Sequence, residues 1–304
     1  MDTRPKRSIR LLSASLLSAG LLAGCGGDQR TDDGRANDRS PRVREERARQ
    51  VADAWRGSAA AAAWARGYHP MADAVQKPVS GWRGETDERA FETRKFVLDG
   101  DLPGPPSAVG KVDWGDGEEL TRPLMGPEKA YQSFALGRGA GPRLTVTGAR
   151  LGTTTIATSR GKATVPAWLF TLEHYDTPLK RVAVTPSKLP EPPIGQARQG
   201  AAGGLRSIPR LAGTAADGRS VTVRATHGSC DDGPVVTALE TGESVVLSAS
   251  VEGAERGACP AVMIEQDVTV GLSRPLGDRV LLDALTGRPV PFGEDPGGTA
   301  PSWT

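Results

Sequence analysis

From Arg94 onward, hydrophobic and polar positions alternate in short runs, and clusters of Gly, Pro or Asp separate these runs. The pattern predicts β-strands joined by turns, and the 38 Gly and 24 Pro of the chain fit such a fold. In the first half of the chain the expected strands are Phe91–Leu98, Lys111–Trp114, Leu144–Ala149, Thr153–Thr158, Ala163–Leu172 and Arg181–Thr185. In the second half they are Val221–Thr226, Val235–Glu240, Ser244–Val251, Ala261–Leu272 and Arg279–Leu282.

The expected strand Ala163–Leu172 differs from the others because both of its faces are apolar. Side chains alternate along a strand, so Val165 and Leu169 point to one side while Trp168 and Phe170 point to the other. A strand that is apolar on both faces is typical of the middle of a covered sheet. We therefore expect this strand to be central.

Two short polar segments predict turns between strands. Ser159–Lys162 separates two of the expected strands and is interpreted as a hairpin turn. The acidic segment Asp113–Glu119 contains Gly115-Asp116-Gly117 and is interpreted as a second hairpin turn. The alternative is a calcium loop, but the alternating Asp or Asn positions and the distant bidentate Glu of an EF-hand are missing from this segment.

Ahead of the strands, residues 42–66 contain no proline and are rich in Ala, Glu and Arg, so they predict a helix with Gly57 as its weak point. An apolar stripe at helical spacing includes Trp55, whereas Trp64 lies about half a turn away from it. We expect Trp64 to be covered by the loop Tyr68-His69-Pro70 that follows. The alternative is a helix that presents Trp64 to a partner.

These patterns predict an α+β protein that is mostly β. An N-terminal helix packs on a β-rich segment, and a disulfide-closed antiparallel β-sandwich or open barrel follows. The expected boundaries are a signal peptide (1–24), a lipidated cysteine with a disordered tether (25–41), a helix plus β-rich domain (42–189), a Pro/Gly linker (190–204), a small β-domain with a disulfide (205–292) and a flexible tail (293–304).

The N-terminus combines positive charge with a short apolar run. Arg4, Lys6, Arg7 and Arg10 precede the uncharged segment Leu11–Gly24, an order that is typical of a secretory signal peptide. A helix that crosses a membrane needs about 20 apolar residues. The run is shorter than that, so we expect a cleaved signal rather than a membrane span.

The end of this run, formed by Leu22, Ala23, Gly24 and Cys25, resembles the bacterial lipobox. The resemblance implies that diacylglycerol is attached to the Cys25 thiol and that the chain is cut between Gly24 and Cys25. The mature protein would then be held at the outer face of the cytoplasmic membrane by acyl chains such as palmitate. The alternative is an ordinary secretory signal with an incidental cysteine.

Cys230 and Cys259 remain as an even pair in a chain that is expected to be exported, which predicts a disulfide bond. A metal site and a catalytic thiol are the competing interpretations. Neither cysteine has Cys-x-x-Cys spacing, and Asp231 and Asp232 beside Cys230 supply no basic group that would lower a thiol pKa. We predict no metal site.

No catalytic motif stands out in the sequence. His69, His174 and His227 lack the spacing of a metal-binding helix, and we expect all three to be surface or loop residues. The segment Gly228-Ser229-Cys230-Asp231 lacks the second glycine of a Gly-x-Ser-x-Gly nucleophile elbow. We therefore predict a protein that is not an enzyme and that needs no cofactor.

The charge of the chain argues against nucleic acid as a partner. The formal net charge is +2, and aromatic residues make up 5% of the chain, so there is neither a strong positive field nor a stacking platform. We expect contact with the membrane through the lipid on Cys25. Envelope proteins or small extracellular ligands are the other partners considered.

As a whole, the chain resembles the lipoproteins of unassigned activity that are common in Streptomyces and related actinobacteria. The phrases that carry this resemblance are Val165-Pro166-Ala167-Trp168-Leu169-Phe170 and Gly277-Asp278-Arg279-Val280-Leu281-Leu282-Asp283. The expected function is that of a lipid-anchored interaction module of the cell envelope. The alternative is a lipid-anchored receptor for a small ligand, with a pocket lined by Trp55, Trp168 or Phe170.

Overall fold

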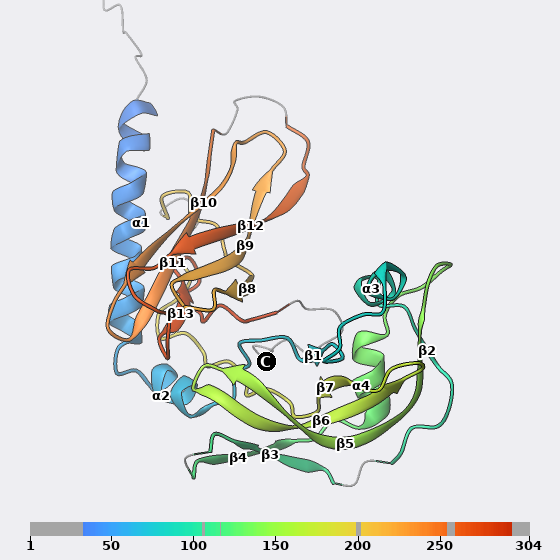
Figure 1. Cartoon of the computed structure of the whole chain (residues 1–304). Helices are drawn as coiled ribbons and strands as arrows, with labels where there is room; N and C mark the ends of the chain where they lie inside the picture. The colour runs from blue at the N-terminus through green and yellow to red at the C-terminus, as the bar shows by residue number, and fades with distance from the viewer. Residues whose placement is uncertain (1–32, 105–106, 116, 199–201, 254–258, 294–304) are drawn as a thin grey trace, which may run out of the picture.

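The structure is a computed structural model that describes residues 33–104, 107–115, 117–198, 202–253 and 259–293, with the side chains of 33–39 left out. It is mostly β, with a long N-terminal helix and several short ones, as the sequence predicts. Figure 1 shows a β-sheet built from the first half of the chain at the bottom of the view and a second group of strands above it, beside the long helix.

The first half of the chain forms a seven-stranded sheet. Its strands are β1 (Val75–Gln76), β2 (Phe96–Leu98), β3 (Val109–Asp113), β4 (Glu119–Pro123), β5 (Leu144–Thr158), β6 (Gly161–Leu172) and β7 (Leu179–Val182). Strand β6 pairs with β5 along one edge and with β3 and β7 along the other. The prediction of a central strand at this position is therefore confirmed.

Two apolar clusters cover the two faces of β6. Trp168 and Phe170 lie in one cluster with Phe134 of helix α4 (Pro127–Phe134), and the indole N–H of Trp168 donates to the carbonyl oxygen of Met125 at 2.7 Å. Val165 lies in the other cluster. Helix α3 (Glu85–Glu92) lies where the sequence pattern predicted the start of a strand, and β2 begins only at Phe96.

The second half of the chain forms a sandwich of two three-stranded sheets. One sheet contains β10 (Gly233–Glu240), β11 (Ser244–Glu252) and β13 (Val280–Asp283), and the other contains β12 (Met263–Gly271), β9 (Ser220–Gly228) and β8 (Arg210–Thr214). Pairing is antiparallel except between β11 and β13. Leu211, Val223 and Leu247 are fully buried between the sheets, so the predicted sandwich is confirmed and no closed barrel forms in the described residues.

Helix α1 (Asp33–Trp55) packs on the outer face of the β10–β11–β13 sheet, where Val51 and Trp55 share an apolar cluster with Val246 and Leu282. The prediction grouped this helix with the strands of residues 42–189, but it covers the sheet of the later segment. The physical reason lies in β11. Its helix-facing row continues from Val246 to the buried Ser248 and Ser250, whose small side chains leave room for a helix.

The predicted helix of residues 42–66 is in fact two helices. Gly57 adopts a positive φ of 64°, and Ser58 then caps α2 (Ala59–Arg66) by accepting a hydrogen bond from the N–H of Ala61. At its other end α1 extends back to Asp33, into the segment that was expected to be tether. Residues 25–32 of that tether, and all of the predicted tail except Gly293, lie outside the described residues.

The Pro/Gly segment between the two halves packs against α1. Ala202 of this segment is buried in the same apolar cluster as Trp55, together with Leu189 and Leu205, which flank the predicted linker. The guanidinium group of Arg47 on α1 donates to the carbonyl oxygens of Gly195 and Ala284. Helix α1 is thus held both by the sandwich and by the segment that was predicted to be a linker.

Candidate functional site

The predicted lipobox of Leu22, Ala23, Gly24 and Cys25 lies outside the described residues. Within the part of the chain that the structure describes, no helix combines the length and the apolar character that a membrane-crossing helix needs. Lipidation of Cys25 therefore stays a prediction from the sequence.

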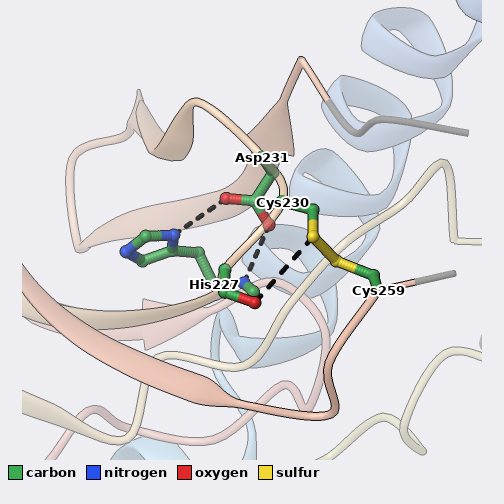
Figure 2. The surroundings of a disulfide bond; sticks show 6 residues. His227, Cys230, Asp231 and Cys259 are labelled. Carbon is green, nitrogen blue, oxygen red and sulfur yellow. Dashed lines mark hydrogen bonds and ion pairs between the residues drawn. A yellow bond between two sulfur atoms is a disulfide. The ribbon is translucent and has the colours of Figure 1, made fainter. Parts of the chain in front are cut away.

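The disulfide between Cys230 and Cys259 is present, with the two Cα atoms 6.2 Å apart (Figure 2). Cys230 lies in the turn between β9 and β10, and Cys259 precedes β12. The bond therefore fastens the chain that enters β12 to the end of the sandwich. This prediction is confirmed, and it rules out both the metal and the free-thiol interpretations of the pair.

Beside the disulfide, His227 and Asp231 form a close pair, as Figure 2 shows. The Nδ1 atom of His227 lies 2.8 Å from Oδ1 of Asp231, which also accepts a hydrogen bond from the N–H of Gly233, while Oδ2 of Asp231 accepts one from the N–H of Gly228. Burial alone would raise the pKa of Asp231, but these three partners hold it below its usual value of 3.8. The carboxylate thereby closes the β9–β10 turn.

Sequence reasoning missed this pair, since the two residues are joined across a turn rather than along a helix. A histidine held by a carboxylate is half of a nucleophile-activating arrangement. In the described part of the chain, however, Asp231 is the only side chain hydrogen-bonded to His227, and the neighbouring Cys230 is consumed in the disulfide. The pair is best explained as a clasp that stabilises the turn.

An exposed apolar segment follows Cys259. We call it the apolar rim, and its residues are Pro260, Ala261, Val262, Met263 and Ile264, all of them exposed. The exposed fractions are 52% for Val262, 76% for Met263 and 38% for Ile264. Consecutive exposed apolar residues are unusual on a soluble surface and mark contact sites.

The apolar rim is fixed at both ends. The disulfide holds Cys259 at one end, and at the other Met263 and Ile264 pair with Gly228 and His227 of β9. The sequence pattern predicted a strand over Ala261–Leu272 but did not predict its exposure. An unbroken apolar run is typical of a strand that is buried on both faces, so the sequence carries no signal for this exposure.

The rest of β12 is polar on its outer face. Arg224 forms a two-pronged ion pair with Asp267, and Arg210 pairs with Glu265 at 2.8 Å. Because each of these carboxylates lies against a guanidinium group, the face carries no strong net charge. The apolar rim is therefore bordered by a neutralised polar surface.

A second unusual group surrounds His69, which is 2% exposed. Its ring stacks on the indole of Trp64, and no hydrogen-bond partner for either ring nitrogen lies within the described residues. Burial lowers the pKa of His69 to about 4, and the positive charge of Arg122 acts in the same direction. The prediction that all three histidines are surface or loop residues holds for the exposed His174. His69 lies in a loop as predicted but is buried, and the prediction is wrong for His227, which lies on β9 and is only partly exposed.

The expectation for Trp64 is confirmed, because its indole is buried under the Tyr68-His69-Pro70 loop. Tyr68 is also fully buried and lies near Arg181; burial lowers the pKa of Arg181 to about 10. Burying a guanidinium group is costly unless it is hydrogen-bonded, and that of Arg181 donates to the hydroxyl of Ser133 and to the carbonyl oxygen of Val182.

The acidic segment and the large aromatic residues occupy structural positions. Strands β3 and β4 pair antiparallel on either side of Asp113–Glu119, which confirms the hairpin interpretation. Trp55, Trp168 and Phe170 are buried in apolar cores, at most 3% exposed. A groove of about 420 Å³ lies elsewhere, between α1 and Ala197, Arg198 and Ala202, and its lining includes the side chains of Arg42 and Glu46.

Comparison of the chain with models of known protein families, with curated proteins and with solved structures found no match.

Proposed function

We propose that this protein is a lipid-anchored extracytoplasmic module that makes contacts within the cell envelope, and that the apolar rim is its contact surface. The observation that carries the proposal is the exposure of five consecutive apolar residues, Pro260 to Ile264, at the end of the sandwich. Exposed apolar surface is unfavourable in water, so the apolar rim gains free energy when a partner surface covers it.

The rigidity of the apolar rim supports a role in binding. A segment fixed by a disulfide and by strand pairing loses little conformational freedom when it meets a partner. A disulfide also fits an oxidising location outside the cytoplasm, which agrees with the signal peptide expected from the sequence. The anchoring at Cys25 rests on the lipobox resemblance alone.

The anchor is tested by Cys25→Ala in a host that processes lipoproteins. The variant should appear in the medium with its fold intact, whereas the parent protein should sediment with membranes. Gly27→Ala is the matched control, because it alters the same short segment but keeps the thiol. Membrane association of Cys25→Ala equal to that of the parent would refute the assignment.

The contact surface is tested by placing a photoreactive amino acid at Met263 in cells that express the anchored protein. Crosslinks from this position to another envelope component are expected, because the side chain is 76% exposed on the apolar rim. A probe at Val79 is the control, since Val79 is 81% exposed but stands alone in the other half of the chain. Equal yields from the two positions would contradict the proposal.

A second candidate is a receptor for a small ligand, and the groove beside α1 favours it. The groove measures about 420 Å³ and is lined by three arginines, Arg42, Arg47 and Arg198, against the single carboxylate of Glu46, an excess of positive charge that suits an anionic ligand. Native mass spectrometry of the secreted Cys25→Ala protein, purified without added ligand, tests this candidate. A bound small molecule that Arg198→Ala abolishes would support the receptor over the module.

A further inference from the structure

The apolar rim and the beginning of α1 lie at the same end of the sandwich. Arg47 of α1 bonds to the carbonyl oxygen of Ala284, whose N–H bonds to the carbonyl oxygen of Leu247 in β11. Farther along β11, Ala249 bridges to Arg206, and nearby Gly203 accepts a hydrogen bond from Arg44, which lies nearer the start of α1 than Arg47. Helix α1 and β11 therefore run in opposite directions.

It follows that β11 runs toward the N-terminal end of α1. Its last residue, Glu252, pairs with Gly233 at the start of β10, next to the turn that holds Cys230. The disulfide places Cys259 and the apolar rim at this same end. Figure 1 shows the start of α1 and this end of the sandwich at the top of the view, away from the seven-stranded sheet.

The chain between Cys25 and α1 is short. Eight residue steps separate Cys25 from Asp33, and an extended chain spans at most about 3.5 Å per residue, or about 28 Å in all. A lipid on Cys25 would therefore keep the N-terminal end of α1 close to the bilayer. The end that carries the apolar rim would face the membrane, while the seven-stranded sheet would face away from it.

We propose that the apolar rim docks onto the bilayer in which Cys25 is anchored, so that the contact partner of the module is the lipid surface itself. This inference rests on the proposed anchoring. A weak apolar contact suffices here, because the tether gives the rim a high effective concentration at the membrane. Met263 and its neighbours would enter the boundary between headgroups and acyl chains.

The charges near the apolar rim define the kind of membrane contact. Asp232 and Glu252 are exposed at this end, and Glu265 is neutralised by Arg210. No cluster of Lys or Arg adjoins the rim among the described residues. The docking is therefore hydrophobic: it takes place on zwitterionic phosphatidylcholine, persists at high salt and weakens as anionic lipid is added.

The experiment uses the mature chain with a hexahistidine tag in place of Cys25, tethered to phosphatidylcholine vesicles through a nickel-chelating lipid. An environment-sensitive fluorophore is attached at Met263→Cys, and the control carries it at Val79→Cys. Both positions are highly exposed, and the native cysteines are joined in a disulfide, so the new thiol alone is labelled.

The fluorophore at position 263 should shift its emission to shorter wavelength on tethering and should be quenched by nitroxide-labelled lipid, while the probe at 79 should not change. A label at Val262→Cys combined with Met263→Asp should lose most of the shift. A water-like emission at 263 on vesicles would overturn the proposal. So would a shift that appears without vesicles as protein concentration rises, since a second copy would then cover the rim.

This experiment is independent of natural lipidation, because the chelating lipid supplies the tether. If Cys25→Ala stays with membranes in cells but position 263 still enters the vesicle surface, the anchor assignment fails and docking by the apolar rim stands. If Cys25→Ala is released but position 263 stays in water, the anchor stands and the docking fails.

Discussion

The indole ring of Trp64 and the imidazole ring of His69 are stacked, with centroids 4.0 Å apart and planes inclined by only 6°. Trp64 belongs to the apolar cluster beneath α1, whereas Tyr68, next to His69, belongs to the cluster of β6 and β7. The carbonyl oxygen of His69 accepts a hydrogen bond from Ser159 at the β5–β6 turn. The stack therefore lies where the two halves of the molecule meet.

The burial of His69 predicts a loss of stability in acid. Its pKa is about 4 in the folded protein against 6.5 when exposed, so the unfolded chain binds the proton more readily. The contribution of neutral His69 to the free energy of unfolding is complete above pH 6.5. It declines by about 3 kcal/mol as the pH falls to 4. Urea unfolding of the parent and of a variant that lacks this histidine, compared at several pH values, measures the contribution.

His69→Phe is the matched variant, because it keeps a flat ring against Trp64 and removes the titrating group. Its stability at pH 7 should equal or exceed that of the parent, since neither ring nitrogen has a partner in the described residues. As the pH falls to 4, the stability difference should grow in favour of the variant by about 3 kcal/mol, because only the parent loses stability to protonation of the histidine. An unchanged difference would contradict the buried, neutral histidine.

Asp283 predicts the opposite dependence. Burial raises its pKa to about 6 despite bonds from Thr286 and the N–H groups of Leu285, Thr286 and Ile208. The contribution of protonated Asp283 to the free energy of unfolding is complete below pH 3.8. It falls by about 3 kcal/mol as the pH rises through 6. Asp283→Asn should lack this decline, and urea unfolding between pH 4 and 7 measures it.

His69 and Asp283 act in opposite directions. The free energy of unfolding of the parent should therefore change little between pH 4 and 6, while that of His69→Phe should fall and that of Asp283→Asn should rise with increasing pH.

Glu240 and Arg279 form a mostly buried ion pair at 2.8 Å. Burial alone would raise the pKa of Glu240, but the N–H of Ser273 and the Arg279 guanidinium lower it to about 2. Glu240→Gln leaves a buried guanidinium without its counter-charge, so we expect a loss of about 3 kcal/mol at pH 7. The loss should be full above pH 4.5 and vanish toward pH 2.

The control for this pair is Glu243→Gln, three residues farther along on the exposed turn. Thermal or urea unfolding should show almost no change for that variant. A comparable loss from both variants would indicate a general charge effect instead of a specific pair.

Removing the disulfide should destabilise the protein. Cys230 and Cys259 close a loop with a separation of 29 residues, which corresponds to about 3.5 kcal/mol on the chain-entropy estimate. The double variant Cys230→Ser/Cys259→Ser, compared with the parent in urea, measures the loss. The parent in the presence of reductant should behave like the variant; equal stability of oxidised and reduced parent would contradict the prediction.

Much of the β structure could be predicted from the sequence, because it depends on local patterns. Alternation located most strands of the sandwich, and short turn signals located the Ser159–Lys162 and Asp113–Glu119 turns. The sequence pattern did not predict very short or polar strands such as β1 and β8, because two to five residues show no clear alternation of apolar and polar positions. Strand β5 runs through a point where the pattern suggested two strands, with an irregular register near Gly148.

The candidate site was predictable only in part. The pairing of Cys230 with Cys259 followed from an even number of cysteines in an expected exported chain. The His227–Asp231 pair did not, because it depends on the geometry of one turn. The burial of His69 was also hidden, since Tyr68-His69-Pro70 has the composition of an ordinary loop.

By itself, the sequence determined the β-rich class, the disulfide and the cover over Trp64, because each depends on neighbours within the chain or on the pairing of two cysteines. The tertiary structure alone decided which sheet α1 covers and which apolar residues stay in water. An apolar stripe specifies that a helix must be buried but not against what. Likewise, the apolar character of Val262, Met263 and Ile264 would suit a buried core. They are exposed because the core between the two sheets of the sandwich does not extend to this end of β12.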